Sequence, residues 1–215
     1  MTKAVIFDLD GTLLNTLGDL TAAVNHALTA HGFPVRTEAQ VRTYIGDGVK
    51  QLIARSCPPD TDEATRGAVL EAYLPYYAAH NMDLTRPYDG VMELLTALTS
   101  AGIRVAVVSN KHNAGVQTLC AHFFGDLLDL AVGGDGTRPL KPAPDSLLYA
   151  MERLAVSPDE VWYVGDSVQD VQTARGAGVR CAAVTWGFQD EDRLAAENPA
   201  ALVDTVAELT AVFEQ

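Results

Sequence analysis

The stretch AVIFDLDGT, residues 4–12, begins with a short apolar run and ends with two acidic residues, a glycine and a threonine. Residues 4–7 lack the alternation of a half-exposed strand, which predicts a strand covered on both faces, as in a parallel sheet. Asp8 and Asp10 follow on the same side of the chain, and Gly11 permits a sharp turn. Because open parallel sheets bind ligands at the carboxyl ends of their strands, this stretch also predicts where a site lies.

Four later apolar runs are similar to the first, and helical patterns lie between them. The runs cover residues 103–108, 128–132, 161–164 and 179–184. Residues 91–98 follow the i, i+3, i+4, i+7 stripe of a helix, and Pro144 begins another helix whose apolar stripe includes Leu147 and Leu148. This alternation predicts an α/β fold with a doubly wound parallel sheet.

Residues 16–85 break the alternation, because they show helical periodicity without a convincing strand. Thr37 and Gln40 form a capping box in this segment. We therefore expect an all-helical cap domain over residues 16–85, inserted into an α/β core domain of residues 1–15 and 86–215. The sheet is expected to resume near Tyr88. The length of 215 residues agrees, since it exceeds the ~150 residues of an average domain.

The composition is that of a globular protein with an acidic surface. Hydrophobic residues make up 48% of the chain, and 28 acidic against 15 basic residues give a net charge of −13. Nucleic acids and anionic membranes require a basic face, so neither is expected as a partner. The three cysteines include no Cys-x-x-Cys pair, and no apolar run has the length of a signal peptide or membrane span. We expect a cytoplasmic monomer or homodimer.

Polar residues follow four of the predicted strands, and Lys141 does so after a Gly-rich loop. In chain order they are Asp8 and Asp10, Ser109 and Asn110, Lys141, and Asp166 and Asp170. Carboxylates this close repel one another unless a cation lies between them, and Mg²⁺ binds through one or two carboxylates plus substrate phosphate. A hydroxyl, backbone N–H groups and a lysine suit phosphate oxygens. Each position alone is also explained by a turn, a helix cap or a surface charge, but structural requirements alone would rarely produce the ordered set.

This ordered set resembles the four motifs of the haloacid dehalogenase (HAD) superfamily of hydrolases with a helical cap. Residues 8–12 resemble the first motif, Ser109 the second, Lys141 the third and residues 165–170, GDSVQD, the fourth. The resemblance covers nearly the whole chain. Within the superfamily, residues 44–48, 141–144 and 185–188 resemble the phosphoglycolate phosphatase branch.

The resemblance implies a Mg²⁺-dependent phosphatase that hydrolyses a small phosphorylated metabolite, with 2-phosphoglycolate as the best guess, through an aspartyl-phosphate. It makes Asp8 the nucleophile and Asp10 the general acid and base, with Ser109 and Lys141 as the other catalytic residues. The residues assigned to substrate or phosphate are Leu9, Thr12, Asn110, Gly46, Asp47 and Gly48. Those assigned to Mg²⁺ are Asp8, Asp10 through its carbonyl, Asp166 and Asp170, the last as a ligand or as support.

Other activities stay open at this point. They are inorganic pyrophosphatase, sugar-phosphate phosphatase, phosphomutase and a module that senses phosphorylated ligands without turnover. Asp10 favours ester hydrolysis, because by resemblance dehalogenases lack it: a leaving halide needs no proton. Asn15 stands where the family often has Asp and is expected to cap the first cap helix. No group of cap residues indicates a carboxylate, sugar or nucleotide pocket.

Overall fold

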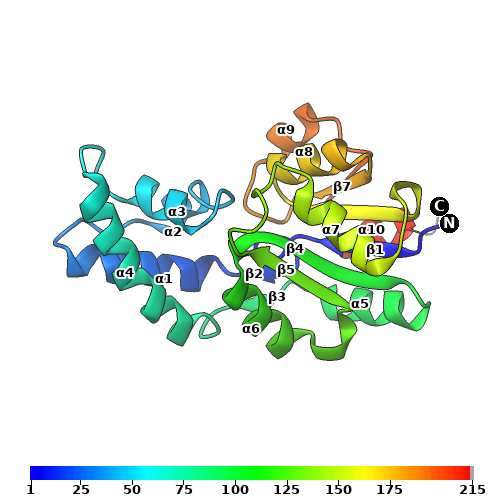
Figure 1. Cartoon of the computed structure of the whole chain (residues 1–215), viewed down its shortest axis with the longest axis horizontal. Helices are drawn as coiled ribbons and strands as arrows, with labels where there is room; N and C mark the ends of the chain where they lie inside the picture. The colour runs from blue at the N-terminus through cyan, green and yellow to red at the C-terminus, as the bar shows by residue number, and fades with distance from the viewer. Residues whose placement is uncertain (214–215) are drawn as a thin grey trace.

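The computed structural model describes residues 1–213 and shows a sheet flanked by helices, with a separate group of helices at one end (Figure 1). The six strands of the sheet are β1 (Ala4–Phe7), β4 (Arg104–His112), β5 (Leu130–Gly134), β6 (Val161–Gly165), β7 (Arg180–Val184) and β8 (Ala201–Val203). They are all parallel and lie in the order β5-β4-β1-β6-β7-β8. The predicted doubly wound parallel sheet is confirmed.

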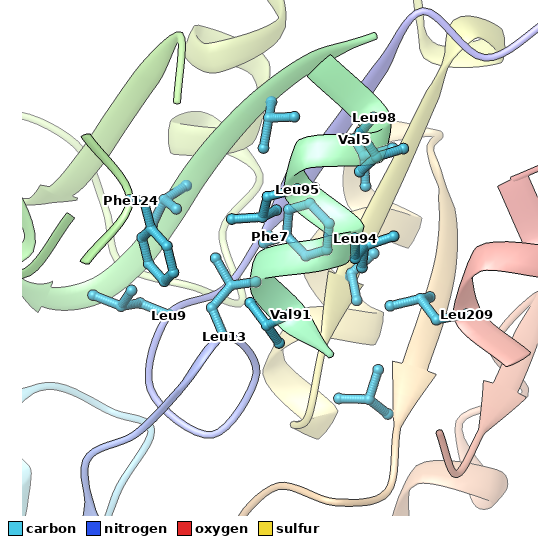
Figure 2. Close-up of a cluster of buried hydrophobic side chains, with 14 of the residues drawn as sticks. Val5, Phe7, Leu9, Leu13, Val91, Leu94, Leu95, Leu98, Phe124 and Leu209 are labelled. Atoms are coloured by element: carbon cyan, nitrogen blue, oxygen red, sulfur yellow. The ribbon is translucent and has the colours of Figure 1, made fainter. Parts of the chain in front are cut away.

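Helices cover both faces of this sheet, which is why its strands are apolar on both sides. In β1, Val5 and Phe7 belong to one buried cluster, whereas Ala4 and Ile6 belong to a second on the opposite face. Figure 2 shows the first cluster, in which α5 (Val91–Ser100) packs Leu94, Leu95 and Leu98 against β1. The other helices of this part are α6 (Asn113–Phe123), α7 (Asp145–Leu154), α8 (Val168–Ala177), α9 (Glu191–Ala196), α10 (Val206–Phe213) and the 3-10 turns η1 (Gly125–Leu127) and η2 (Pro158–Glu160).

Four helices between β1 and β4 have a hydrophobic core of their own. They are α1 (Leu17–Ala30), α2 (Glu38–Arg42), α3 (Val49–Ser56) and α4 (Glu63–His80). Leu28, Ile53 and Tyr73 lie in this third cluster, which includes no residue of the sheet. The capping box of Thr37 and Gln40 begins α2 as expected. We call these four helices and their connections the cap.

A two-stranded antiparallel ribbon joins the cap to the rest of the chain. It consists of β2 (Leu14–Asn15) and β3 (Arg86–Pro87), which pair Leu14 with Pro87. The six-stranded sheet therefore resumes at Arg104 and not near Tyr88. Asn15 lies in β2 and Thr16 occupies the N-cap position of α1, but the Thr16 side chain makes no capping bond. Asn15 Oδ1 accepts a bond of 3.3 Å from the Leu17 amide, so Asn15 caps the first turn from one residue before the N-cap position.

Three smaller expectations can also be compared with the structure. Leu148 is 45% exposed, so it does not belong to the core stripe of α7, whereas Leu147 is fully buried. The three cysteines are buried and free. Over residues 1–213, the structure contains no helix that combines the length and the hydropathy needed to cross a membrane.

Candidate active site

The carboxyl ends of β4, β1 and β6 meet at one point, because these three strands are neighbours in the sheet. Phe7 pairs with Val107 on one side and with Val164 on the other, so the next residues of each strand lie together. A cavity of about 200 Å³ opens there between the sheet and the cap. Its wall includes these predicted site residues: Asp8, Asp10, Ser109, Asn110 and Asp166 from the core, and Gly46 and Gly48 from the cap.

Lys141 is a buried cation at the centre of the site. Its Nζ lies 2.9 Å from Asp8 Oδ1 and 2.7 Å from Asp170 Oδ1, and the residue is only 5% exposed. Burial alone lowers the pKa of Lys141, but the carboxylates of Asp170 and Asp8 outweigh this effect and hold the pKa above its usual value. Lys141 is therefore ionised and fixed beside Asp8.

Both carboxylate oxygens of Asp170 are already engaged within the protein. Oδ1 accepts hydrogen bonds from Lys141 Nζ at 2.7 Å and from the Tyr163 hydroxyl at 3.0 Å. Oδ2 accepts from the Ser167 amide at 3.1 Å and from its hydroxyl at 2.5 Å. This arrangement favours Asp170 as a support that orients Lys141 over Asp170 as a metal ligand.

Asp166 is positioned by two donors from distant parts of the chain. Its Oδ1 accepts from the Thr12 hydroxyl at 3.0 Å, and its Oδ2 accepts from the Phe188 amide at 2.7 Å. Thr12, which was assigned to substrate or phosphate, thus contacts Asp166 and is itself buried. The side chain of Leu9 is fully buried in the core, so only its backbone remains for a phosphate.

The residues present fit a divalent cation. Oxygens of Asp8, Asp166 and Asp170 lie within 4.8 Å of one another, and the Lys141 ammonium contacts those of Asp8 and Asp170. Asp8 Oδ1 receives no well-directed hydrogen bond from the described residues. Burial raises the pKa of Asp8 to about 6. Burial and the nearby charges of Asp8 and Asp170 raise the pKa of Asp166 to about 8. These are hard oxygen donors, and Lys141 balances only part of their negative charge. Mg²⁺ prefers such ligands.

Glycines make room for these carboxylates. A Cβ atom at Gly165 would lie 2.2 Å from Asp170 Cγ, and one at Gly187 would lie 2.2 Å from Asp166 Cβ. Because neither aspartate can move without breaking its hydrogen bonds, no larger residue fits at these positions.

We expect Gly165→Ala to lower the free energy of unfolding by about 3 kcal/mol, because the new methyl group overlaps the bonded Asp170 carboxylate. Urea denaturation measures the loss. Gly67→Ala is the matched control: Gly67 is exposed on α4 with open space around it, so this variant should be stabilised by about 0.5–1 kcal/mol. Equal stability of Gly165→Ala and wild type would contradict the packing argument.

Asp10 is held by a residue that the sequence analysis did not identify. Lys111 Nζ lies 2.9 Å from Asp10 Oδ1 and 3.1 Å from Oδ2. The ring of Tyr77, from α4 of the cap, faces the same ammonium group at 4.7 Å. The only sequence signal was the place of Lys111 at the same strand end as Ser109 and Asn110.

The cap loop of residues 46–48 contacts the core at the site. The Asn110 side-chain amide donates to the Gly46 carbonyl at 2.9 Å and to the Lys141 carbonyl at 3.0 Å. Asp47 accepts a bond of 2.9 Å from Gln169 Nε2 and forms an ion pair with Arg55. The structure therefore brings Gly46 and Gly48 to the cavity, while Asp47 ties the loop to α8.

The fold and the site define an α/β protein with a cavity at the carboxyl edge of a parallel sheet, beneath an inserted group of helices. A sequence model of the haloacid dehalogenase-like hydrolase family matches residues 5–184. The chain belongs to this family.

Relatives of this chain share most of their length with it. Phosphoglycolate phosphatase 1 of Pseudomonas aeruginosa is 34% identical, with 100% of this chain and 81% of the relative covered. N-acetylmuramic acid 6-phosphate phosphatase of the same organism is 33% identical, with 99% and 95% covered. The crystal structure of a predicted phosphoglycolate phosphatase from Haemophilus somnus 129PT is 30% identical and has a TM-score of 0.92, with 98% and 97% covered.

Proposed function

We propose that this protein is a Mg²⁺-dependent phosphatase that hydrolyses a small organic phosphate monoester, with 2-phosphoglycolate as the first candidate. The observation that carries the proposal is the buried Asp8, held 2.9 Å from Lys141 at the floor of a cavity that also includes Asp10 and Ser109. The phosphoglycolate phosphatases among its relatives support the choice of substrate. The relative that acts on N-acetylmuramic acid 6-phosphate makes that compound the second candidate.

The proposed reaction has two steps, both centred on Asp8. In the first, an Asp8 carboxylate oxygen attacks phosphorus, the bond from phosphorus to the ester oxygen breaks, and Asp10 protonates the leaving alkoxide. In the second, Asp10 takes a proton from water as the water oxygen attacks phosphorus. The bond between phosphorus and Asp8 breaks, which releases inorganic phosphate and restores both aspartates.

The remaining site residues have supporting roles in this proposal. Lys141 offsets the charge of Asp8 and keeps it ionised, while Asp170 holds Lys141. The Ser109 hydroxyl and the backbone amides of Leu9 and Asn110 bind phosphoryl oxygens. Mg²⁺, when bound by Asp8, the Asp10 carbonyl and Asp166, supplies positive charge that offsets the repulsion between carboxylates and phosphate.

The cap is proposed to be a domain of residues 16–85, inserted into a core domain of residues 1–15 and 86–215. It covers the cavity and excludes water from the reacting phosphorus. Gly46 and Gly48 place backbone groups of the cap at the site. Three buried free thiols are compatible with a reducing cytoplasm as the place where the protein works.

A phosphate-release assay across a panel of phosphate esters tests the proposal. We expect the highest kcat/KM for 2-phosphoglycolate, with N-acetylmuramic acid 6-phosphate next and pyrophosphate and hexose phosphates below both. EDTA should reduce activity to background, and Mg²⁺ in excess should restore it, because the carboxylate cluster then regains its cation. Full activity in EDTA would refute the metal assignment. A clear preference for pyrophosphate or a hexose phosphate would refute the substrate.

A further inference from the structure

Lys111 occupies an unusual position for a lysine, because its charged end is buried at the junction of core and cap. Its side chain is 7% exposed and forms a two-oxygen ion pair with Asp10. Its aliphatic part runs past Gly115 of α6, where a Cβ atom would lie 3.5 Å from Lys111 Cε. Burial of a long cationic side chain costs free energy, which indicates that Lys111 has a function at this position.

Lys111 is the only lysine or arginine among the described residues that line the cavity. Lys141 does not line it and is engaged by Asp8, Asp170 and the Tyr163 hydroxyl. Much of the wall on the cap side is apolar, with Leu20, Val49 and Leu52 among its members. An anionic group beyond the phosphoryl site would therefore find one ammonium group, which it would share with Asp10, in surroundings where charges attract more strongly than in water.

Tyr77 supplies a second polar group at the same place. It lines the cavity, is 9% exposed and faces the Lys111 ammonium with its ring. Its hydroxyl is buried and has no hydrogen-bond partner within residues 1–213. Because buried hydroxyl groups are almost always hydrogen-bonded, the missing partner of this one needs an explanation, and a ligand that reaches it would supply that partner.

We propose that Lys111, assisted by Tyr77, recognises a carboxylate on the leaving-group half of the substrate. This inference rests on the proposed phosphatase function and adds the substrate class: phosphate monoesters whose alcohol carries a carboxylate. An ammonium group has three donors, so Lys111 can bind a substrate carboxylate while it still contacts Asp10. The core thus supplies the charge, and the cap supplies a neutral donor.

Matched substrate pairs test the proposal, because the members of each pair differ in the group that carries the carboxylate. One pair is 2-phosphoglycolate and 2-hydroxyethyl phosphate. The other is N-acetylmuramic acid 6-phosphate and N-acetylglucosamine 6-phosphate, which lacks the lactyl carboxylate. The readout is the ratio of kcat/KM within a pair. For a pair that the wild type hydrolyses, we expect this ratio to favour the carboxylate by about 10- to 100-fold, as for a charge-assisted hydrogen bond.

Lys111→Met should bring this ratio close to one. Loss of the Asp10 contact lowers activity on both members of a pair and cancels in the ratio. Lys111→Arg should keep most of the ratio because it keeps the charge, and Tyr77→Phe should lower it about threefold, mainly through KM of the carboxylate substrate. Lys50→Met, which removes an exposed lysine of α3, should leave the ratio unchanged and serves as the control.

The outcomes separate this inference from the proposed function. An active Lys111→Met enzyme that keeps the wild-type ratio would overturn the carboxylate role and leave the phosphatase assignment standing. If that variant does not fold, Lys111→Gln and Tyr77→Phe give the same test, and unchanged ratios in both overturn the inference. A wild-type enzyme that releases phosphate from all four compounds without preference for a carboxylate also overturns it. Absence of any phosphatase activity refutes the proposed function instead.

Discussion

Asp8→Asn should abolish phosphate release and leave the fold intact. Asparagine has nearly the shape of aspartate but lacks the anionic oxygen that attacks phosphorus, so we expect kcat to fall by about 10⁴-fold or more. Water should replace the missing nucleophile poorly, because Asp8 is buried beside Lys141 at the floor of the cavity. Release of inorganic phosphate under saturating 2-phosphoglycolate and Mg²⁺ measures the effect.

Asp60→Asn is the control for Asp8→Asn, since Asp60 is an exposed aspartate of the cap and its loss should leave kcat unchanged. Circular dichroism of both variants should match that of the wild type. If Asp8→Asn retained more than a few per cent of the wild-type kcat, Asp8 would not be the nucleophile and the two-step reaction would fail with it.

Lys141→Met should damage stability and activity together. It leaves the carboxylates of Asp8 and Asp170 buried without the ammonium that both contact, and removal of one partner from a buried ion pair costs about 3–5 kcal/mol. Activity should fall to near background, because an uncompensated Asp8 favours its protonated form and loses its nucleophilic oxygen. Urea denaturation and phosphate release measure the two effects.

A double variant shows whether the uncompensated buried charge causes the loss of stability in Lys141→Met. Lys141→Met combined with Asp170→Asn should recover part of the lost stability, since one uncompensated carboxylate is then neutral, while activity stays lost. If Lys141→Met cost less than about 1 kcal/mol, the ion pairs would contribute little to folding. If the double variant were less stable than the sum of both single changes, the charge argument would be wrong.

The strands of the large sheet were predictable because their surroundings are uniform. In β1, Ala4, Val5, Ile6 and Phe7 are all buried, and this leaves an unbroken apolar run in the sequence. β8 was missed because three residues at the edge of a sheet give too short a pattern. The ribbon of β2 and β3 has two residues in each strand, one of them Pro87, and only the junction of cap and core makes it form.

Much of the wall of the cavity could be predicted for a related reason. The candidates of the core were sought at the strand ends, and the neighbouring order of β4, β1 and β6 brings Asp8, Ser109 and Asp166 together. Ser109 lies within β4, which runs on to His112 and not only to the predicted end at residue 108. Lys111 and Tyr163 were missed because they act through partners elsewhere in the sequence: Lys111 contacts Asp10, and the Tyr163 hydroxyl contacts Asp170. A lysine near the end of a strand and a tyrosine within an apolar strand carry no local mark of such partners.

The antiparallel ribbon of β2 and β3 has a consequence for the order in which the chain folds. β1 and β4 are neighbours in the sheet, yet roughly 70 residues of cap are inserted between them, and closure of a flexible loop of that length costs roughly 4 kcal/mol of chain entropy. If the cap helices assemble first, pairing of Leu14 with Pro87 brings the two ends of the insertion together. Only a short loop then remains to be closed before β1 pairs with β4. The two strands are distant in sequence, but they can pair as fast as strands joined by a short connection.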